Sequence, residues 1–145
     1  MLQKSDKINI YEGFGGDFTL RNTNNHNVSL KDYRGRVIVM FFGYTACPDN
    51  CPITLSVLKQ VVVRLNKQAD KLQVLFITID PKKDTPEKMK KFLSAFQANF
   101  IGLTGTKEEI LKVAENYGSA FMKNPKFFDS ELNYLMIHTG NIYLV

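Results

Sequence analysis

The chain has 145 residues and a net charge of +5, from 19 lysines and arginines against 14 aspartates and glutamates. Its apolar content of 44% suits a globular protein, and we expect one domain over residues 1–145. No apolar run approaches the ~18 residues of a membrane span, and no nucleic-acid-binding motif accompanies the basic charge, so we expect no nucleic-acid partner.

The first half of the chain predicts two short strands, a buried strand and a helix. Residues 18–20 and 28–30 are typical of short strands on either side of an asparagine-rich turn. Residues 37–42 form a continuous apolar run, which is typical of a central strand buried on both faces. Residues 54–67 carry leucine and valine at helical spacing and predict an amphipathic helix.

The second half predicts a strand, two helices and two final strands. Residues 72–79 form another apolar run and predict a second buried strand. Thr85-Pro86 is typical of the start of a helix, and Thr106 with Glu109 forms a capping-box pattern. The remaining predicted elements are helices over residues 87–97 and 106–117 and strands over residues 132–136 and 141–145.

Cys47 and Cys51 are the only two cysteines, and both lie between the first buried strand and the helix that follows it. Free backbone N–H groups at the start of a helix favour the thiolate form of a cysteine. Thiols one helical turn apart have Cα atoms about 6 Å apart, so this pair could form a disulfide or bind a soft metal ion such as Cu(I) or zinc. Two cysteines cannot complete a four-ligand site, so further ligands must come from elsewhere. A buried inert pair or a structural disulfide is the alternative interpretation.

The chain has two histidines, and they differ in their surroundings. His26 lies in the asparagine-rich turn, where we expect an exposed loop residue. His138 comes just before the last predicted strand. A lone histidine next to an apolar segment is usually a core or edge residue, so its sequence position alone does not make it a ligand.

The order of the elements predicts an α/β thioredoxin-like fold, with a central mixed sheet flanked by helices and a short N-terminal β extension. Sites in such sheets form beyond the carboxyl ends of the parallel strands. Most thioredoxin-like proteins carry a cis-proline in the loop that faces the dithiol, whereas this chain has His138 there. The fold therefore predicts that His138 lies opposite Cys47 and Cys51, so that two thiolates and one imidazole form a copper site.

Several motifs resemble a known family. Cys47-Pro48-Asp49-Asn50-Cys51-Pro52 is followed by Asp80-Pro81, by Asp84-Thr85-Pro86 and by a late His138. In this combination the chain resembles the soluble domain of Sco/SenC proteins, which deliver copper during cytochrome c oxidase assembly. Further matching segments are residues 15–20, 42–45 and 102–105 and Tyr134.

The resemblance implies that Cys47, Cys51 and His138 bind Cu(I) and Cu(II). It implies as partners the copper-bearing subunit of cytochrome c oxidase and other copper-handling or thiol-reducing proteins. It also implies a monomer with an N-terminal membrane anchor, on the periplasmic side of the inner membrane or in the mitochondrial intermembrane space. The family usually has an acidic residue where this chain has Ile137, and it continues with a strand and a helix beyond the position of Val145, so we expect these to be missing here.

Other functions stay open at this stage. A thiol–disulfide oxidoreductase would use the same dithiol to reduce partner cysteines and would need no histidine. We therefore expect mainly a copper chaperone, with reductase activity as the alternative, and a thiol peroxidase of the same fold as a weaker one. Asp80 ends the second buried strand, where it either forms a turn or supports the site.

Overall fold

A six-stranded mixed sheet forms the centre of the structure, which is a computed structural model. The structure describes residues 13, 15–46, 50–119, 121–128, 134–138 and 142–145. The strand order is β2-β1-β5-β4-β3-β8, and a separate two-stranded sheet pairs β6 with β7. The strands are β1 (Thr19–Asn22), β2 (Asn27–Ser29), β3 (Val37–Gly43), β4 (Leu72–Thr78), β5 (Phe100–Thr104), β6 (Phe121–Phe128), β7 (Tyr134–His138) and β8 (Ile142–Leu144).

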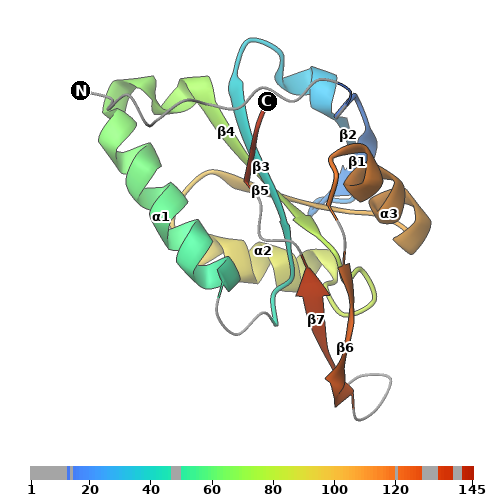
Figure 1. Cartoon of the computed structure of the whole chain (residues 1–145). Coiled ribbons are helices and arrows are strands. Elements are labelled where there is room, and N and C mark those ends of the chain that lie inside the picture. The colour runs from blue at the N-terminus through green and yellow to red at the C-terminus, as the bar shows by residue number, and fades with distance from the viewer. Residues whose placement is uncertain (1–12, 14, 47–49, 120, 129–133, 139–141) are drawn as a thin grey trace, which may run out of the picture.

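Helices cover both faces of the sheet (Figure 1). They are α1 (Asn50–Leu65), α2 (Pro86–Ser94) and α3 (Lys107–Asn116), with short 3₁₀ segments η1 (Leu30–Tyr33) and η2 (Asn66–Lys71). Side chains of α1 and α2 pack on one face, and side chains of α3 pack on the other. None of the helices in the described part of the chain is long and apolar enough to cross a membrane.

The three central strands β3, β4 and β5 are parallel, and helices connect them. Because parallel neighbours need a crossover, the chain passes through α1 between β3 and β4 and through α2 between β4 and β5. The antiparallel strands β1 and β8 join the two sides of this centre. This arrangement, with the β1–β2 hairpin as the N-terminal extension, confirms the predicted mixed sheet flanked by helices.

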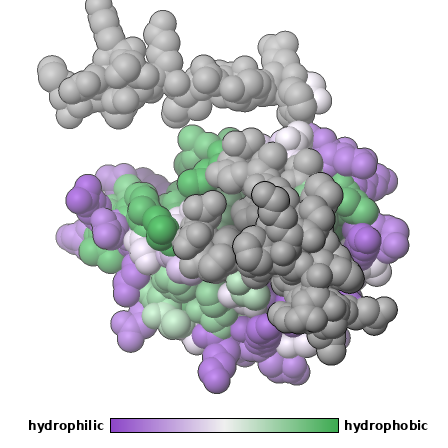
Figure 2. Space-filling model, turned by 60° about the horizontal axis from the view of Figure 1, so that its bottom comes forward, coloured by the Kyte–Doolittle hydropathy of each residue, from purple (hydrophilic) through white to green (hydrophobic). Residues whose placement is uncertain are grey.

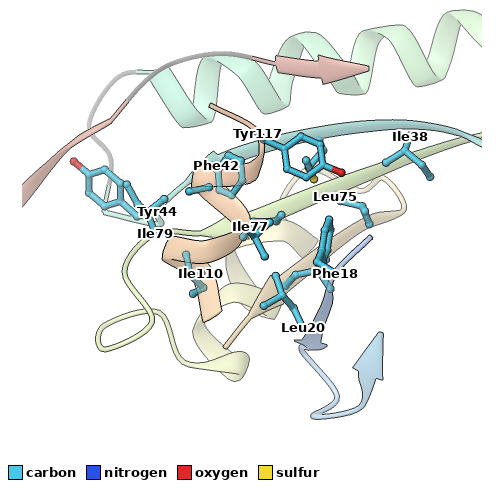
Figure 3. Close-up of a cluster of buried hydrophobic side chains, with 14 residues drawn as sticks. Phe18, Leu20, Ile38, Phe42, Tyr44, Leu75, Ile77, Ile79, Ile110 and Tyr117 are labelled. Carbon is cyan, nitrogen blue, oxygen red and sulfur yellow. The ribbon is translucent and has the colours of Figure 1, made fainter. Parts of the chain in front are cut away.

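Strand β3 divides the hydrophobic core into two clusters. Its even-numbered residues Ile38, Met40 and Phe42 face α3 (Figure 3), whereas Val39 and Phe41 face α1 and α2. Alternate side chains of a strand point to opposite faces, so a strand between two helical layers must be apolar throughout. This explains the continuous apolar run that predicted β3.

Two strands that the structure contains were not predicted from the sequence. In β5, Gly102 interrupts the β-forming pattern, yet a Cβ there would come within 2.9 Å of Leu93 and of Met89. A side chain at this position would have to displace the ends of Leu93 and Met89, so the glycine suits the close packing of α2 on β5. In β6, Pro125 and two lysines weaken the strand pattern, and the pairing with β7 is irregular between Lys123 and Phe128.

Some predicted boundaries were wrong. Helix α1 begins at Asn50, earlier than the predicted residue 54, and its last predicted residues belong to η2. Strand β7 lies two residues later than predicted, so that His138 is its last residue. Both shifts affect the site, because they place Cys51 inside a helix and His138 inside a strand.

Candidate metal and dithiol site

The dithiol segment joins the carboxyl end of β3 to the start of α1. Strand β3 ends at Gly43, and Cys51 is the second residue of α1. The first turn of α1 contains no acidic residue, so nothing in that turn opposes a thiolate at the helix N-terminus. Cys47 lies outside the described residues, and only the backbone of Cys51 is described.

The register of β8 brings the segment that carries His138 to the same end of the sheet. Ile142, the first residue of β8, pairs with Phe41 near the carboxyl end of β3. Strand β7, which ends at His138, runs back toward this end of β3 (Figure 1). The predicted proximity of His138 to Cys47 involves residues outside those that the structure describes. The structure does not describe the side chain of His138, so the three-ligand copper site stays a prediction.

A buried carboxylate holds the start of the dithiol loop. Asp84 is 1% exposed, and its Oδ2 accepts a hydrogen bond from the backbone N–H of Thr45 at 3.0 Å. Its Oδ1 accepts from Thr45 Oγ1 at 2.5 Å, and its Oδ2 also accepts from Thr78 Oγ1 at 2.7 Å. Thr45 lies two residues before Cys47 in the sequence. Asp84 therefore joins the dithiol loop to the end of β4.

Sequence reasoning assigned no role to Asp84, although the Asp-Thr-Pro motif contains it. The residues that it contacts are far away in the sequence, since 39 positions separate it from Thr45. The available signal was an acidic residue just before the N-cap Thr85 of α2. That signal points to a helix start and says nothing of a contact with another loop.

Asp80 forms a turn after β4, which was one of the two roles predicted for it. It is 4% exposed, its N–H donates to Thr78 Oγ1 at 3.0 Å, and its carbonyl accepts from the N–H of Asp84 at 2.9 Å. These bonds bend the chain back after β4. The second role, support of the site, stays a prediction.

His26 is exposed in the turn between β1 and β2, as expected. Its N–H donates to the Asn22 side chain, and its carbonyl accepts from the Asn22 N–H. Among the side chains that the structure describes, no three histidine, cysteine, aspartate or glutamate residues cluster as metal ligands. Cys47 and the side chains of Cys51 and His138 lie outside that set.

Comparison with known proteins identifies the family. The family model of SCO1/SenC matches residues 8–145, which is most of the chain. The chain belongs to the SCO1/SenC family. An SCO2-like protein of Rickettsia felis is 37% identical over 142 residues, which cover 96% of this chain and 69% of the relative. The mitochondrial SCO1 homolog of Homo sapiens is 37% identical over 133 residues, which cover 90% of this chain and 44% of the relative.

Solved structures of the family share the fold. ScoI of Bradyrhizobium japonicum, with copper bound, is 40% identical, has a TM-score of 0.83, and the match covers 90% of this chain and 82% of ScoI. BsSco, described as a member of the Sco family of cytochrome c oxidase assembly proteins with a disulfide switch, is 26% identical. Its TM-score is 0.63, and the match covers 77% of this chain and 67% of BsSco. These likenesses confirm the thioredoxin-like fold of the Sco proteins.

Proposed function

We propose that this chain binds copper through Cys47, Cys51 and His138 and delivers it to, or helps to mature, the binuclear copper centre of cytochrome c oxidase. The observation that carries the proposal is the likeness to copper-bound ScoI over 90% of the chain. The backbone adds support, because α1, which contains Cys51, follows β3, and Ile142, four residues after His138, pairs with Phe41 of the same strand.

The donor set fits the metal. Thiolates are soft ligands that select Cu(I), and imidazole is a common copper ligand. Cu(I) is stable with few ligands, so two thiolates and one imidazole are sufficient. The thiols must lose their protons before they bind, and the helix N-terminus at Cys51 favours that loss.

The family also supports a place in the cell. The human relative is mitochondrial. We therefore propose that this chain works in the periplasm or the intermembrane space, held at the membrane by an anchor. Its partners there would be the copper-bearing subunit of cytochrome c oxidase and proteins that supply copper or reduce thiols, and residues 1–145 would act as one domain.

The first test is copper binding by cysteine variants. We expect one Cu(I) per chain for the reduced protein and a loss of affinity of at least a hundredfold in Cys47→Ala or Cys51→Ala, because each variant removes one of two thiolate ligands. The measurement is competition for Cu(I) with a chromophoric chelator. The oxidised protein serves as a control and should not bind, since the disulfide removes both thiolates. Wild-type affinity in either variant would refute the assigned site.

A thiol–disulfide oxidoreductase is the second candidate, and the disulfide switch described for BsSco favours it. His138→Ala separates the two functions. Imidazole contributes more to Cu(II) than to Cu(I), which two thiolates already hold, so we expect this variant to lose Cu(II) binding and to keep weakened Cu(I) binding. Disulfide formation between Cys47 and Cys51 should persist, because thiol exchange needs no imidazole.

The affinity of His138→Ala for Cu(I) and for Cu(II) is measured by titration. A thiol–disulfide assay on the same variant measures whether the Cys47–Cys51 disulfide still forms. His26→Ala is the matched control, because His26 lies in an exposed turn away from the dithiol segment. If His138→Ala binds Cu(II) like the parent, His138 is not a ligand and the oxidoreductase function becomes the better candidate.

A further inference from the structure

We propose that Asp84 is a positioning residue for the dithiol: through Thr45 it sets the conformation from which the dithiol loop binds copper or closes its disulfide. This inference deepens the proposed function and rests on it. Thr45 lies two residues before Cys47. The Asp84 carboxylate accepts hydrogen bonds from both the backbone N–H and the side-chain hydroxyl of Thr45.

The geometry shows why Asp84 is suited to this role. Thr45 donates two hydrogen bonds to Asp84, one from its backbone N–H and one from its hydroxyl. Together they fix both the position and the orientation of Thr45, which a single bond would not do. The third bond, from Thr78 Oγ1, attaches the carboxylate to the last residue of β4. Thr78 Oγ1 in turn accepts the N–H of Asp80. Thr45, at the start of the dithiol loop, is therefore joined to the end of β4 by a continuous set of hydrogen bonds.

The energetics make this connection strong. A buried carboxylate is costly unless its oxygens accept hydrogen bonds, and bonds to a charged acceptor are stronger than neutral ones. Asp84 is almost fully buried and takes three such bonds. Because the carboxylate would lose these partners if the loop moved away, it opposes that movement. Thr45 is thus held in place without any metal.

The consequence for the dithiol is preorganisation. Groups that orient metal ligands typically contribute 10- to 100-fold to metal affinity. The same restraint raises the effective concentration of one thiol at the other, which favours the disulfide. Both effects should weaken when the bond between Asp84 and Thr45 is lost.

Asp84→Asn tests the charge, and Thr45→Val tests the hydroxyl bond while it keeps the backbone N–H. We expect Cu(I) affinity to fall about tenfold or more in each variant. Thr45→Ser keeps the hydroxyl and should restore most of the affinity. The double variant Asp84→Asn with Thr45→Val should lose less than the product of the two single losses, because both act through the same bond.

The second readout contains no copper, so it stands even if the proposed copper function fails. In equilibrium with glutathione, the two thiols transfer two electrons and two protons to oxidised glutathione, which yields the Cys47–Cys51 disulfide and two reduced glutathiones. We expect the equilibrium constant for disulfide formation to fall about tenfold in Asp84→Asn and Thr45→Val, a shift of roughly 30 mV.

The thermal midpoint of each variant is measured alongside these readouts. If Asp84→Asn lowers the midpoint but leaves both Cu(I) affinity and the glutathione equilibrium unchanged, Asp84 is only structural and the proposal is wrong. If Asp84→Asn does not fold, Thr45→Val decides. Unchanged affinity and an unchanged equilibrium in that variant would also overturn the proposal, whereas losses that Thr45→Ser reverses would support it.

Discussion

At the scale of the residue, Tyr117 shows how burial produces a pH dependence. Its hydroxyl donates to the carbonyl of Gly16 at 2.8 Å, and its ring makes an edge contact with Tyr143. Burial raises the pKa of Tyr117 above its usual 10.0, and the charge of Asp17 raises it further. The folded state therefore keeps the phenol proton more firmly than the unfolded state does.

The sign of the effect on stability follows from this shift. Because the pKa is raised in the folded state, the contribution of Tyr117 is complete below pH 10.0 and is lost as the pH rises through the folded-state pKa. We expect the free energy of unfolding to fall above pH 10.0, and to fall less in Tyr117→Phe. At neutral pH this variant should lose about 1 kcal/mol with its hydrogen bond. Urea unfolding at neutral and alkaline pH makes the comparison.

Tyr33 is the matched control, because burial also raises its pKa. Tyr33→Phe should remove only the part of the alkaline fall in the free energy of unfolding that Tyr33 causes, and should leave the part caused by Tyr117. An alkaline loss in Tyr117→Phe as steep as in the parent would show that Tyr117 does not cause it.

At the scale of the element, the start of α3 depends on a reciprocal cap. Thr106 Oγ1 accepts the N–H of Glu109, and Glu109 Oε2 accepts the N–H of Thr106, both at 3.1 Å. Gly105 leaves space for this arrangement, since a Cβ there would come within 2.5 Å of Glu109 Oε2. We expect Thr106→Ala to cost about 1 kcal/mol in the free energy of unfolding, measured with urea, and Thr106→Ser to cost much less.

The same cap provides a control for the proposed role of Asp84. Helix α3 packs on the sheet face opposite α1, so a weaker cap should lower stability without changing the dithiol. We expect the glutathione equilibrium of Thr106→Ala to match that of the parent. A tenfold change in that equilibrium would show that the dithiol responds to any loss of stability. The effect of Asp84→Asn on the dithiol could then not be assigned to the bond between Asp84 and Thr45.

At the scale of the whole molecule, β8 is the outermost strand at its side of the sheet among the described residues. In the described residues β8 pairs only with β3, and Ile142 and Leu144 are 51% and 54% exposed. They pair with Phe41 and Val39, so they lie on the face that α1 covers. Helix α1 exposes Val57 and Val61 as well. Apolar side chains also reach the surface among charged ones in Figure 2.

An open edge strand with apolar flanks tends to pair with another copy. The resemblance to the family led us to expect a monomer, whereas this edge predicts that the 145-residue chain associates as its concentration rises. Leu144→Lys should reduce the association, because a charge on an edge strand opposes pairing. Sedimentation velocity over a range of concentrations measures it, with Val63→Lys as a control of equal charge on α1. A chain that stays monomeric at every concentration would contradict the prediction.

The sequence by itself determined the elements whose cause is local. The apolar runs of β3 and β4 predicted strands between two helical layers, and Thr85-Pro86 and the Thr106 capping box predicted the starts of α2 and α3. The strand before the dithiol and the helix after it were also predictable, because both segments carry a strong pattern of their own, although the helix begins early enough to include Cys51.

Only the tertiary structure decided the features that depend on distant partners. Gly102 of β5 faces the ends of Leu93 and Met89 of α2, and this contact is visible only when both elements are in place. Phe41 near the end of β3 pairs with Ile142 at the start of β8, and no local sequence pattern predicts this register. Asp84 bonds Thr45 across 39 positions. A local pattern follows from the backbone preferences of neighbouring residues, whereas these contacts arise from burial and hydrogen bonding that exist only after the chain has folded.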